Sequence, residues 1–190
     1  MNVLYAKVAL YAYAHLDALA DQIDEIVEKK AFSSSMNFSP AINQFEDIIE
    51  LTYQKQVVFA LKLCCEDSLK GFTDKEKLYF DYKYFKTRTK AEYAGLDTVS
   101  RAYFRLQIRL AEKFAKNLEK AGFSDERFKA ECLSMDFFRE MLSRVKEKEN
   151  LNRKNKTEKE KAQIKTLKSK IAKNAAPKTE KAPCGDAISA

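Results

Sequence analysis

The sequence of 190 residues has little of what sheets, metal centres and membrane spans are built from. It contains only 4 glycines and 3 prolines, which tight turns require, and this scarcity indicates long helices with few connections. A single histidine, His15, and the lack of a Cys-x-x-Cys pair argue against a zinc site. No run approaches the ~20 apolar residues that a membrane-spanning helix needs. We therefore expect an all-α cytoplasmic protein with no metal, no cofactor and no membrane partner.

Sequence signatures of common enzyme classes are also missing. The chain has no Gly-x-x-x-x-Gly-Lys-Ser/Thr loop, no Gly-x-Ser-x-Gly motif and no His-Glu-x-x-His motif. We interpret Cys64, Cys65 and Cys132 as small packing residues on helices in a reducing compartment. No nucleophile stands beside a base in the sequence, so we expect no catalytic residue and no enzymatic activity.

Charge is divided unevenly along the chain, whose formal net charge is +7. Residues 1–81 hold 8 Lys/Arg and 13 Asp/Glu, whereas residues 82–116 hold 9 basic and 3 acidic residues, and residues 144–182 hold 14 and 5. Such basic blocks favour a polyanionic partner, most often nucleic acid. A lysine-rich segment that only keeps the protein in solution explains the last block equally well. Residues 150–190 have too few apolar residues to fold alone and are predicted to be a disordered basic tail.

Residues 1–70 predict a long antiparallel helical hairpin. Apolar residues at helical spacing predict one helix over residues 2–30 and a second over about 40–69, with 31–40 as the connector. Two long amphipathic helices joined by a short connector pack antiparallel in the manner of a coiled coil. The apolar positions are Leu4, Val8, Leu16, Leu19, Ile23 and Ile26, then Ile42, Phe45, Ile49, Tyr53, Val57, Ala60 and Cys64.

Residues 72–149 predict a second helical region whose helix starts are marked by capping residues. A Ser or Thr followed three residues later by Glu satisfies backbone N–H groups at a helix N-terminus. These starts predict helices over 73–85, 89–95, 101–121 and from 125 to about 149, the last either continuous or broken near Ser134. The capping boxes are Thr73-x-x-Glu76 and Thr89-x-x-Glu92, the single caps are Ser100 and Ser124, and hydrophobic staples pair Val99 with Phe104 and Phe123 with Phe128.

The predicted helices at 89–95 and 101–121 are joined by a short turn that contains glycine, which is the arrangement of a helix-turn-helix. On a helical wheel, the second of them has an apolar side opposite a basic ridge. Such a helix fits the major groove of duplex DNA, where arginine binds guanine or phosphate. A helical bundle whose arginines are merely solvated is equally consistent with the spacing. The ridge is Arg101, Arg105, Arg109 and Lys113, and the apolar side is Phe104, Ile108, Ala111, Ala115 and Leu118, flanked by Leu110 and Phe114.

An aromatic cluster in the predicted helix at 73–85 has two interpretations. Because lysines alternate with the rings, the cluster could stack on the bases of single-stranded nucleic acid. We favour packing against the hairpin, with Tyr84 the most exposed ring. The cluster is Tyr79, Phe80, Tyr82, Tyr84 and Phe85.

Three elements within residues 72–121 follow a known pattern. The first helix opens with Phe72-Thr73-Asp-Lys-Glu76 and later carries Tyr82-Lys-Tyr84-Phe85, and the third opens with Ser100-Arg101 followed by Phe104-Arg105. Together these elements resemble region four, the C-terminal region of bacterial sigma factors and their relatives in phages and mobile elements. The middle helix departs from the family, with Lys90-Ala-Glu-Tyr-Ala-Gly where Glu-x-Ala-x-x-Leu-Gly is usual, and residues 1–70 contain no region-two sequence.

The resemblance implies a sigma-like transcription regulator that reads duplex DNA, rather than a complete sigma factor. The hairpin would bind RNA polymerase or another protein, or would form a homodimer. The alternative is a helical adaptor without enzymatic activity, whose arginines pair with an acidic protein. The candidates for base contacts are Arg101, Tyr103, Arg105, Gln107 and Arg109, and the other candidates for DNA contacts are Lys113, Lys83, Lys86, Arg88 and Lys90.

Overall fold

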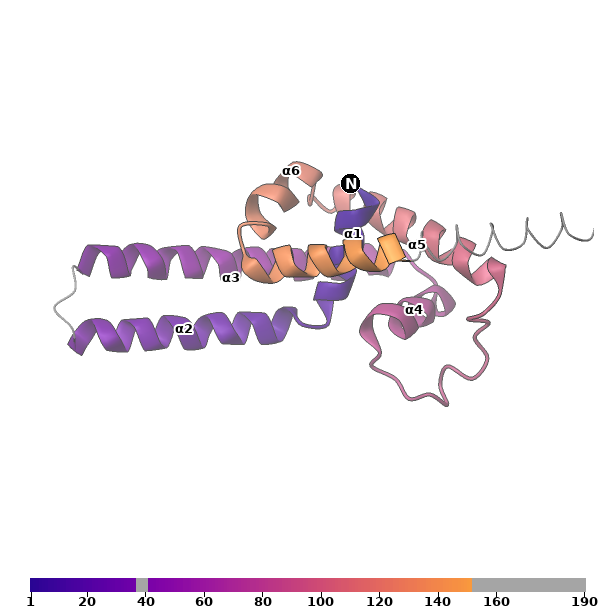
Figure 1. The fold of residues 1–190 in the computed structure, drawn as a ribbon, viewed down its shortest axis with the longest axis horizontal. Coiled ribbons are helices and arrows are strands. Elements are labelled where there is room, and N and C mark those ends of the chain that lie inside the picture. The colour runs from indigo at the N-terminus through magenta and orange to yellow at the C-terminus, as the bar shows by residue number, and fades with distance from the viewer. Residues whose placement is uncertain (37–40, 152–190) are drawn as a thin grey trace, which may run out of the picture. The chain divides into compact units, whose positions relative to one another are not determined.

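The structure of the chain, a computed structural model, describes residues 1–36 and 41–151, so most of the predicted tail lies outside the described residues. Within the described ranges the chain contains helices, turns and irregular segments and no strand, which confirms the all-α prediction (Figure 1). The elements are α1 (Val3–Tyr13), α2 (Leu16–Met36), α3 (Ala41–Lys70), α4 (Asp74–Phe80) with a π-helical turn (Asp81–Phe85), α5 (Arg101–Lys120), α6 (Asp125–Arg127) with a second π-helical turn (Phe128–Cys132), and a last helix over 136–151.

The predicted antiparallel hairpin is confirmed, and it consists of α2 and α3 (Figure 1). Three ion pairs cross between the two helices and join residues in opposite order along them, as antiparallel packing requires. Partly exposed pairs of this kind each contribute about 0–1 kcal/mol, so they define the register more than they add stability. The pairs are Lys62–Asp17 at 2.6 Å, Lys55–Asp24 at 2.6 Å, and Lys30–Asp47.

The prediction of one helix over residues 2–30 is wrong, because the chain breaks between α1 and α2. The N–H of His15 donates to the carbonyl oxygen of Ala12 at 2.7 Å, a tight turn that ends α1. Val8, Ala9 and Leu10 are consecutive and fully buried, so α1 has no solvent-facing side there. A helix that is apolar all round belongs inside a bundle, whereas α2 has one apolar face and remains at the surface.

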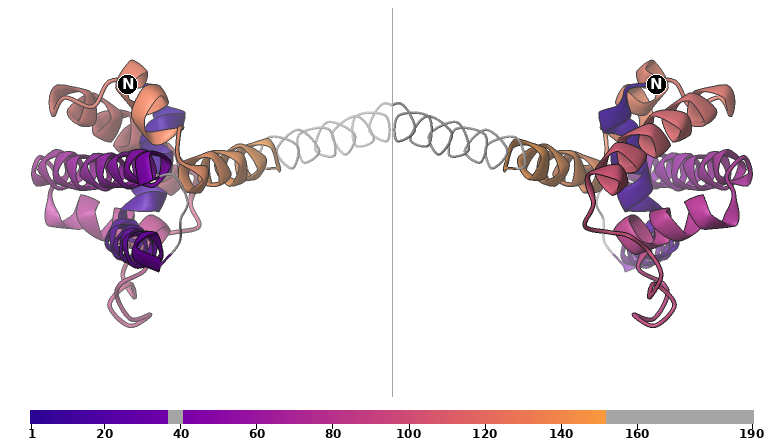
Figure 2. Two further views of the ribbon diagram at one scale, coloured as in Figure 1. Left: turned by 90° about the vertical axis from the view of Figure 1, so that its left-hand side faces the viewer. Right: turned by 90° about the vertical axis from the view of Figure 1, so that its right-hand side faces the viewer.

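The core surrounds α1, which contacts α3, α5 and the first π-helical turn. Figure 2 shows α1 passing between α3 and α5. Phenylalanine rings fill the remaining space, with Phe80 6.0 Å from Phe114 and Phe128 6.0 Å from Phe138 between ring centroids. All four rings are fully buried. These contacts hold α5 against α4 and the last helix against the second π-helical turn.

The predicted caps of α4, α5 and α6 are confirmed. Thr73 and Glu76 make both hydrogen bonds of a capping box. The hydroxyl of Ser100 accepts from the N–H of Tyr103, and that of Ser124 accepts from the N–H of Arg127, each at 3.2 Å. Gly122, with φ at +96°, lies in the left-handed region that glycine tolerates and follows the end of α5.

The predicted short helix at 89–95 does not form, and residues 86–100 run as turns into α5. The capping contact itself is present, since the N–H of Thr89 donates to the Glu92 carboxylate at 2.8 Å. A single turn of helix fixes several residues for little hydrogen bonding, so a short helix needs packing to persist. Six of the seven residues from Thr89 to Gly95 are exposed, and only Tyr93 is partly buried. The predicted helix-turn-helix therefore lacks the first of its two helices, the one expected before the turn.

Candidate nucleic-acid interface

The N-terminal half of α5 presents a basic ridge to solvent. Arg101, Arg105 and Arg109 recur every four residues, so they lie along one side of the helix, and all three are exposed. Exposed Lys116 continues this side, and Glu112 is the one acidic residue within it. We call Arg101, Arg105 and Arg109 the arginine ridge.

The arginine ridge differs from the other arginines of the described chain in having no acidic partner. Arg88, Arg127, Arg139 and Arg144 each lie within 4.0 Å of a carboxylate. Within residues 1–36 and 41–151, no such ion pair involves the arginine ridge. Three adjacent guanidinium groups that are exposed and unneutralised form a surface suited to an anionic partner.

Two of the predicted base-contacting residues are buried, and this corrects the predicted rotation of α5. Tyr103 is 9% exposed and Gln107 is 4% exposed, whereas Phe104 and Ile108 are 59% and 55% exposed. The ring of Tyr103 packs 5.9 Å from that of Tyr79 on α4, and this contact turns the helix away from the predicted orientation. Tyr103 and Gln107 therefore leave the set of candidate DNA contacts.

Gln107 is buried without a hydrogen-bond partner. Neither its amide oxygen nor its amide nitrogen has one among the described residues. A buried polar group left in this state costs about 1–3 kcal/mol. No sequence signal marks Gln107 as a core residue, since glutamine is mostly exposed in folded proteins.

Lys113, the fourth predicted ridge residue, is held by α4. Its ammonium lies 3.2 Å from the Glu76 carboxylate and 4.3 Å from the centre of the Phe72 ring. The backbone N–H of Thr73, together with Lys113, keeps the pKa of Glu76 below its usual range. Lys113 therefore joins α5 to the capping box of α4 and is less available to a partner than the arginine ridge.

Buried Asp81 anchors the segment that leads into α5. Its carboxylate accepts hydrogen bonds from the backbone N–H of Thr87 at 3.2 Å and from the hydroxyls of Thr87 and Tyr93. Burial by itself raises the pKa of Asp81, but these hydrogen bonds outweigh it and hold the pKa below the usual range. Lys86, with φ at +55°, turns the chain at the end of the π-helical turn.

The remaining predicted DNA contacts lie on or beside the segment that Asp81 anchors, residues 86–96. Lys86 and Lys90 are exposed, and Arg88 is half exposed beside Asp81 at 3.9 Å. Lys83 lies 5.0 Å from the centre of the Tyr84 ring. Tyr84 is itself 6% exposed, so the prediction that it is the most exposed ring of its cluster is wrong.

Loss of the Asp81 anchor should loosen residues 86–96 without unfolding the protein. We expect Asp81→Ala to speed amide hydrogen exchange in this segment at pH 7, because the hydroxyls of Thr87 and Tyr93 lose their acceptor. Because the folded-state pKa of Asp81 is lowered, the anchor is intact above about pH 4 and is lost as the pH falls through that pKa. Asp74→Ala is the control, since its carboxylate is fully exposed. Unchanged exchange in the Asp81 variant would contradict the anchor.

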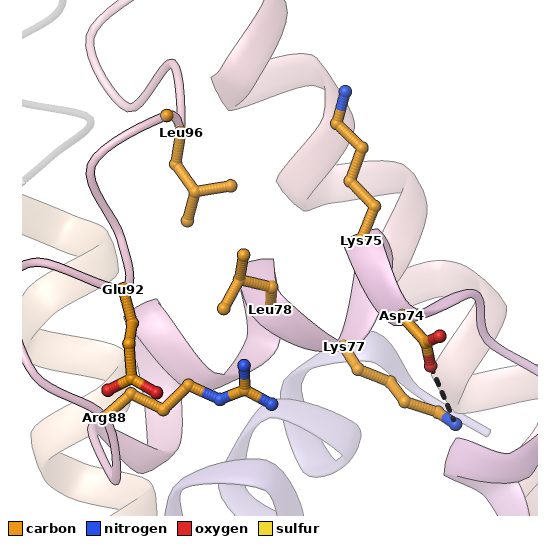
Figure 3. Close-up of a pocket in the computed structure, with 8 residues that line it drawn as sticks. Asp74, Lys75, Lys77, Leu78, Arg88, Glu92 and Leu96 are labelled. Carbon is orange, nitrogen blue, oxygen red and sulfur yellow. Dashed lines mark ion pairs between the residues drawn. The ribbon is translucent and has the colours of Figure 1, made fainter.

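A cleft of about 430 Å³ lies between α4 and the anchored segment. Figure 3 shows Lys77 and Asp74 on α4, joined by an ion pair, and Arg88 and Glu92 on the facing segment. Both charge signs line the cleft in similar number, so its lining selects neither an anionic nor a cationic ligand. The other lining residues are Lys75, Leu78, Gly95 and Leu96.

Nothing in the described residues supports a metal-binding site or a reactive cysteine. No group of three or more His, Cys, Asp or Glu side chains there is placed to hold a metal ion. Burial raises the pKa values of the Cys65 and Cys132 thiols, which keeps both protonated and unreactive at neutral pH. No helix in the described ranges is long and apolar enough to cross a bilayer.

Comparison of the chain with protein-family models, characterised proteins and solved structures finds no match in any of the three.

Proposed function

We propose that the chain binds duplex DNA through the arginine ridge of α5. The supporting observation is that Arg101, Arg105 and Arg109 are exposed and unpaired, whereas every other arginine of the described chain is paired with a carboxylate. Arginine presents five N–H donors in a planar fork that matches phosphate and the edge of guanine. Capping by Ser100 and packing of the opposite face onto α1 and α3 hold the ridge on a rigid helix.

Surrounding basic residues add to the attraction. Exposed Lys86, Lys90 and Lys116 flank the ridge in sequence, and residues 144–182 supply a further basic block. Each phosphate that a protein neutralises releases counterions and makes binding more sensitive to salt. The ridge therefore provides orientation, and the basic block adds affinity that does not depend on sequence.

Removing the ridge should weaken DNA binding and reduce its dependence on salt. We expect Arg101→Ala/Arg105→Ala/Arg109→Ala to bind duplex DNA about tenfold or more weakly, with the slope of log K against log salt concentration smaller by about 3. The measurement is fluorescence anisotropy of labelled duplex DNA between 50 and 200 mM salt, roughly the range over which phosphate-dependent affinities change most visibly.

The control is Arg139→Ala, which removes an exposed arginine that already has an acidic partner and lies outside the basic block of residues 144–182. We expect its affinity and salt slope to stay close to those of the parent. Equal losses in both variants, or no loss in the ridge variant, would assign binding to net charge and contradict the proposal.

The more specific proposal is a transcription regulator resembling sigma region four. It is supported by the Thr73 capping box, the Ser100 cap and the ridge that follows, and the absence of a helix at 89–95 weighs against it. Selection from a random pool of duplex DNA tests it: a regulator of this type enriches one sequence motif at both low and high salt. Binding without an enriched motif would leave a DNA-binding protein that does not read sequence.

A second candidate function, a protein-binding adaptor, has one specific observation in its favour. Val99, Phe104 and Ile108 lie beside the ridge and are 86%, 59% and 55% exposed. Large apolar side chains gathered at the surface are typical of a protein-binding site and are unusual where the only partner is a phosphate backbone. In an adaptor, Phe104→Ala/Ile108→Ala would abolish partner binding. Under the DNA-binding proposal the same variant retains DNA affinity.

A further inference from the structure

One face of α3 has a row of large apolar side chains left uncovered by the described residues. Phe45, Ile49, Tyr53, Phe59 and Leu63 are 64%, 68%, 48%, 43% and 64% exposed. Other residues of α3, among them Val58 and Leu61, are buried, and Lys55 and Lys62 pair with carboxylates on α2. Thus α3 has two apolar faces, and a helix of this kind normally lies between two partners. We call the five exposed residues the outer stripe.

Four residues of the outer stripe, Phe45, Ile49, Phe59 and Leu63, lie on a coiled-coil seam. Starting at Phe45, the seam advances by alternating steps of four and three residues through 49, 52, 56, 59 and 63. This is the 3.5-residue repeat by which two helices interlock their side chains. Its ends are apolar, and its centre consists of exposed Thr52 and Gln56, with Tyr53 at the edge.

The seam also has the same pattern in both directions along the helix. Its six positions are symmetric about Gln54, so an antiparallel copy of α3 in that register aligns like with like. Phe45 then lies opposite Leu63, and Ile49 lies opposite Phe59. Thr52 lies opposite Gln56, which pairs the two polar positions. The spacing of any such seam is symmetric, so the self-complementarity that a two-fold interface of identical chains requires lies in the residue classes: apolar positions face apolar positions and polar positions face polar ones.

We propose that a second copy of this chain covers the outer stripe, with the two α3 helices packed antiparallel about a two-fold axis near Gln54. The two hairpins then form a bundle of four helices, α2 and α3 from each copy. In Figure 1 the half of the hairpin near its connector extends beyond α1, α4 and α5, which leaves it accessible to a partner. This inference does not depend on the proposed DNA binding.

Charge and area both fit a partner of identical sequence. Lys55 and Lys62, the two lysines of α3 between the ends of the seam, already have acidic partners on α2, so neither brings an uncompensated positive charge to the interface. The five exposed side chains offer roughly 500–600 Å² of surface, taking about 200 Å² for a fully exposed large side chain. Thr52, Gln56 and the stems of neighbouring side chains bring each copy toward the ~800 Å² that a specific interface buries per partner.

Sedimentation analysis of the full chain without nucleic acid tests the dimer. We expect the parent to sediment as a dimer at micromolar concentration and Ile49→Asp to sediment as a monomer with unchanged helical circular dichroism. The matched control is Ile108→Asp, which changes an isoleucine of similar exposure on α5 and should remain dimeric. A monomeric parent, or an Ile49→Asp variant that stays dimeric, would overturn the proposal.

Cross-linking with a short bismaleimide tests the register. A mixture of Ile49→Cys and Phe59→Cys chains should yield linked dimers, because these positions face each other across the axis. Each variant alone should give no more product than the parent, since its two introduced cysteines lie ten residues, about 15 Å, apart along the antiparallel pair. Efficient linking of either variant alone would contradict the antiparallel register.

Discussion

Replacing Phe114 by alanine should lower the free energy of unfolding by about 3–5 kcal/mol, the range measured for buried phenylalanine in other proteins. Phe114 is fully buried on α5, and its ring lies 6.0 Å from that of Phe80, centroid to centroid. Its removal leaves a cavity where α5 meets α4, and the surrounding rings can collapse into it only in part. The measurement is urea-induced unfolding followed by circular dichroism.

Phe104→Ala on the same helix is the control for this prediction. Because the Phe104 ring is 59% exposed, the same substitution there should cost much less than in Phe114→Ala. The pair also tests the observed rotation of α5, since the helical wheel predicted from sequence placed Phe104 in the core and Phe114 at its edge. A larger loss for Phe104→Ala would restore the predicted rotation and would contradict the burial of Tyr103.

Gln107→Met should make the protein more stable by about 1–3 kcal/mol, because it removes a buried amide that has no hydrogen-bond partner. Methionine is unbranched like glutamine and close to it in size, so the core should accept it without strain. The measurement is again the free energy of unfolding in urea. DNA affinity should remain at the parental value, since Gln107 lies on the buried face of α5.

The matched control is Gln54→Met, whose side chain donates to the Glu50 carboxylate at 3.0 Å. Since that amide is satisfied, its replacement should bring no comparable gain. A Gln107→Met variant that loses stability, or that loses selectivity among DNA sequences, would place Gln107 at the surface as a base-contacting residue.

Features that depend on neighbouring residues in sequence were predictable. The Thr73, Ser100 and Ser124 caps use side chains within three residues of the groups that they bond, so the sequence carries the full signal. The hydrophobic staple between Phe123 and Phe128 is confirmed, with ring centroids 6.3 Å apart. The corresponding staple at Val99 is not, because Val99 and its predicted partner Phe104 remain 86% and 59% exposed.

The rotation of α5 and the break after α1, which depend on distant contacts, were predicted incorrectly. The rotation of α5 follows from the packing of Tyr103 on Tyr79 in another helix, which a helical wheel does not contain. The break after α1 was missed because the spacing of leucine and valine suggested one face, while the intervening alanines were not counted as core residues. Burial of Ala6, Ala9 and Ala12 shows that small side chains here allow close approach of neighbouring helices.

The Thr89 capping box forms, but the helix that it predicts does not. Its hydrogen bonds form, with Thr89 and Glu92 in contact, but the chain continues as turns instead of a helix. The hydroxyl of Tyr93 donates to Asp81, which fixes the segment in another conformation. A cap satisfies backbone groups, but a short helix also needs an apolar face to bury, and this segment has none.

The most direct test of the central claim uses the unmodified chain. Arginine modification by phenylglyoxal, read by mass spectrometry with and without duplex DNA, reports which guanidinium groups the DNA covers. We predict that DNA protects Arg101, Arg105 and Arg109 and leaves Arg139 as reactive as before. Equal modification of the arginine ridge in free and DNA-bound protein would show that DNA binds elsewhere and would contradict the assignment of α5 as the interface.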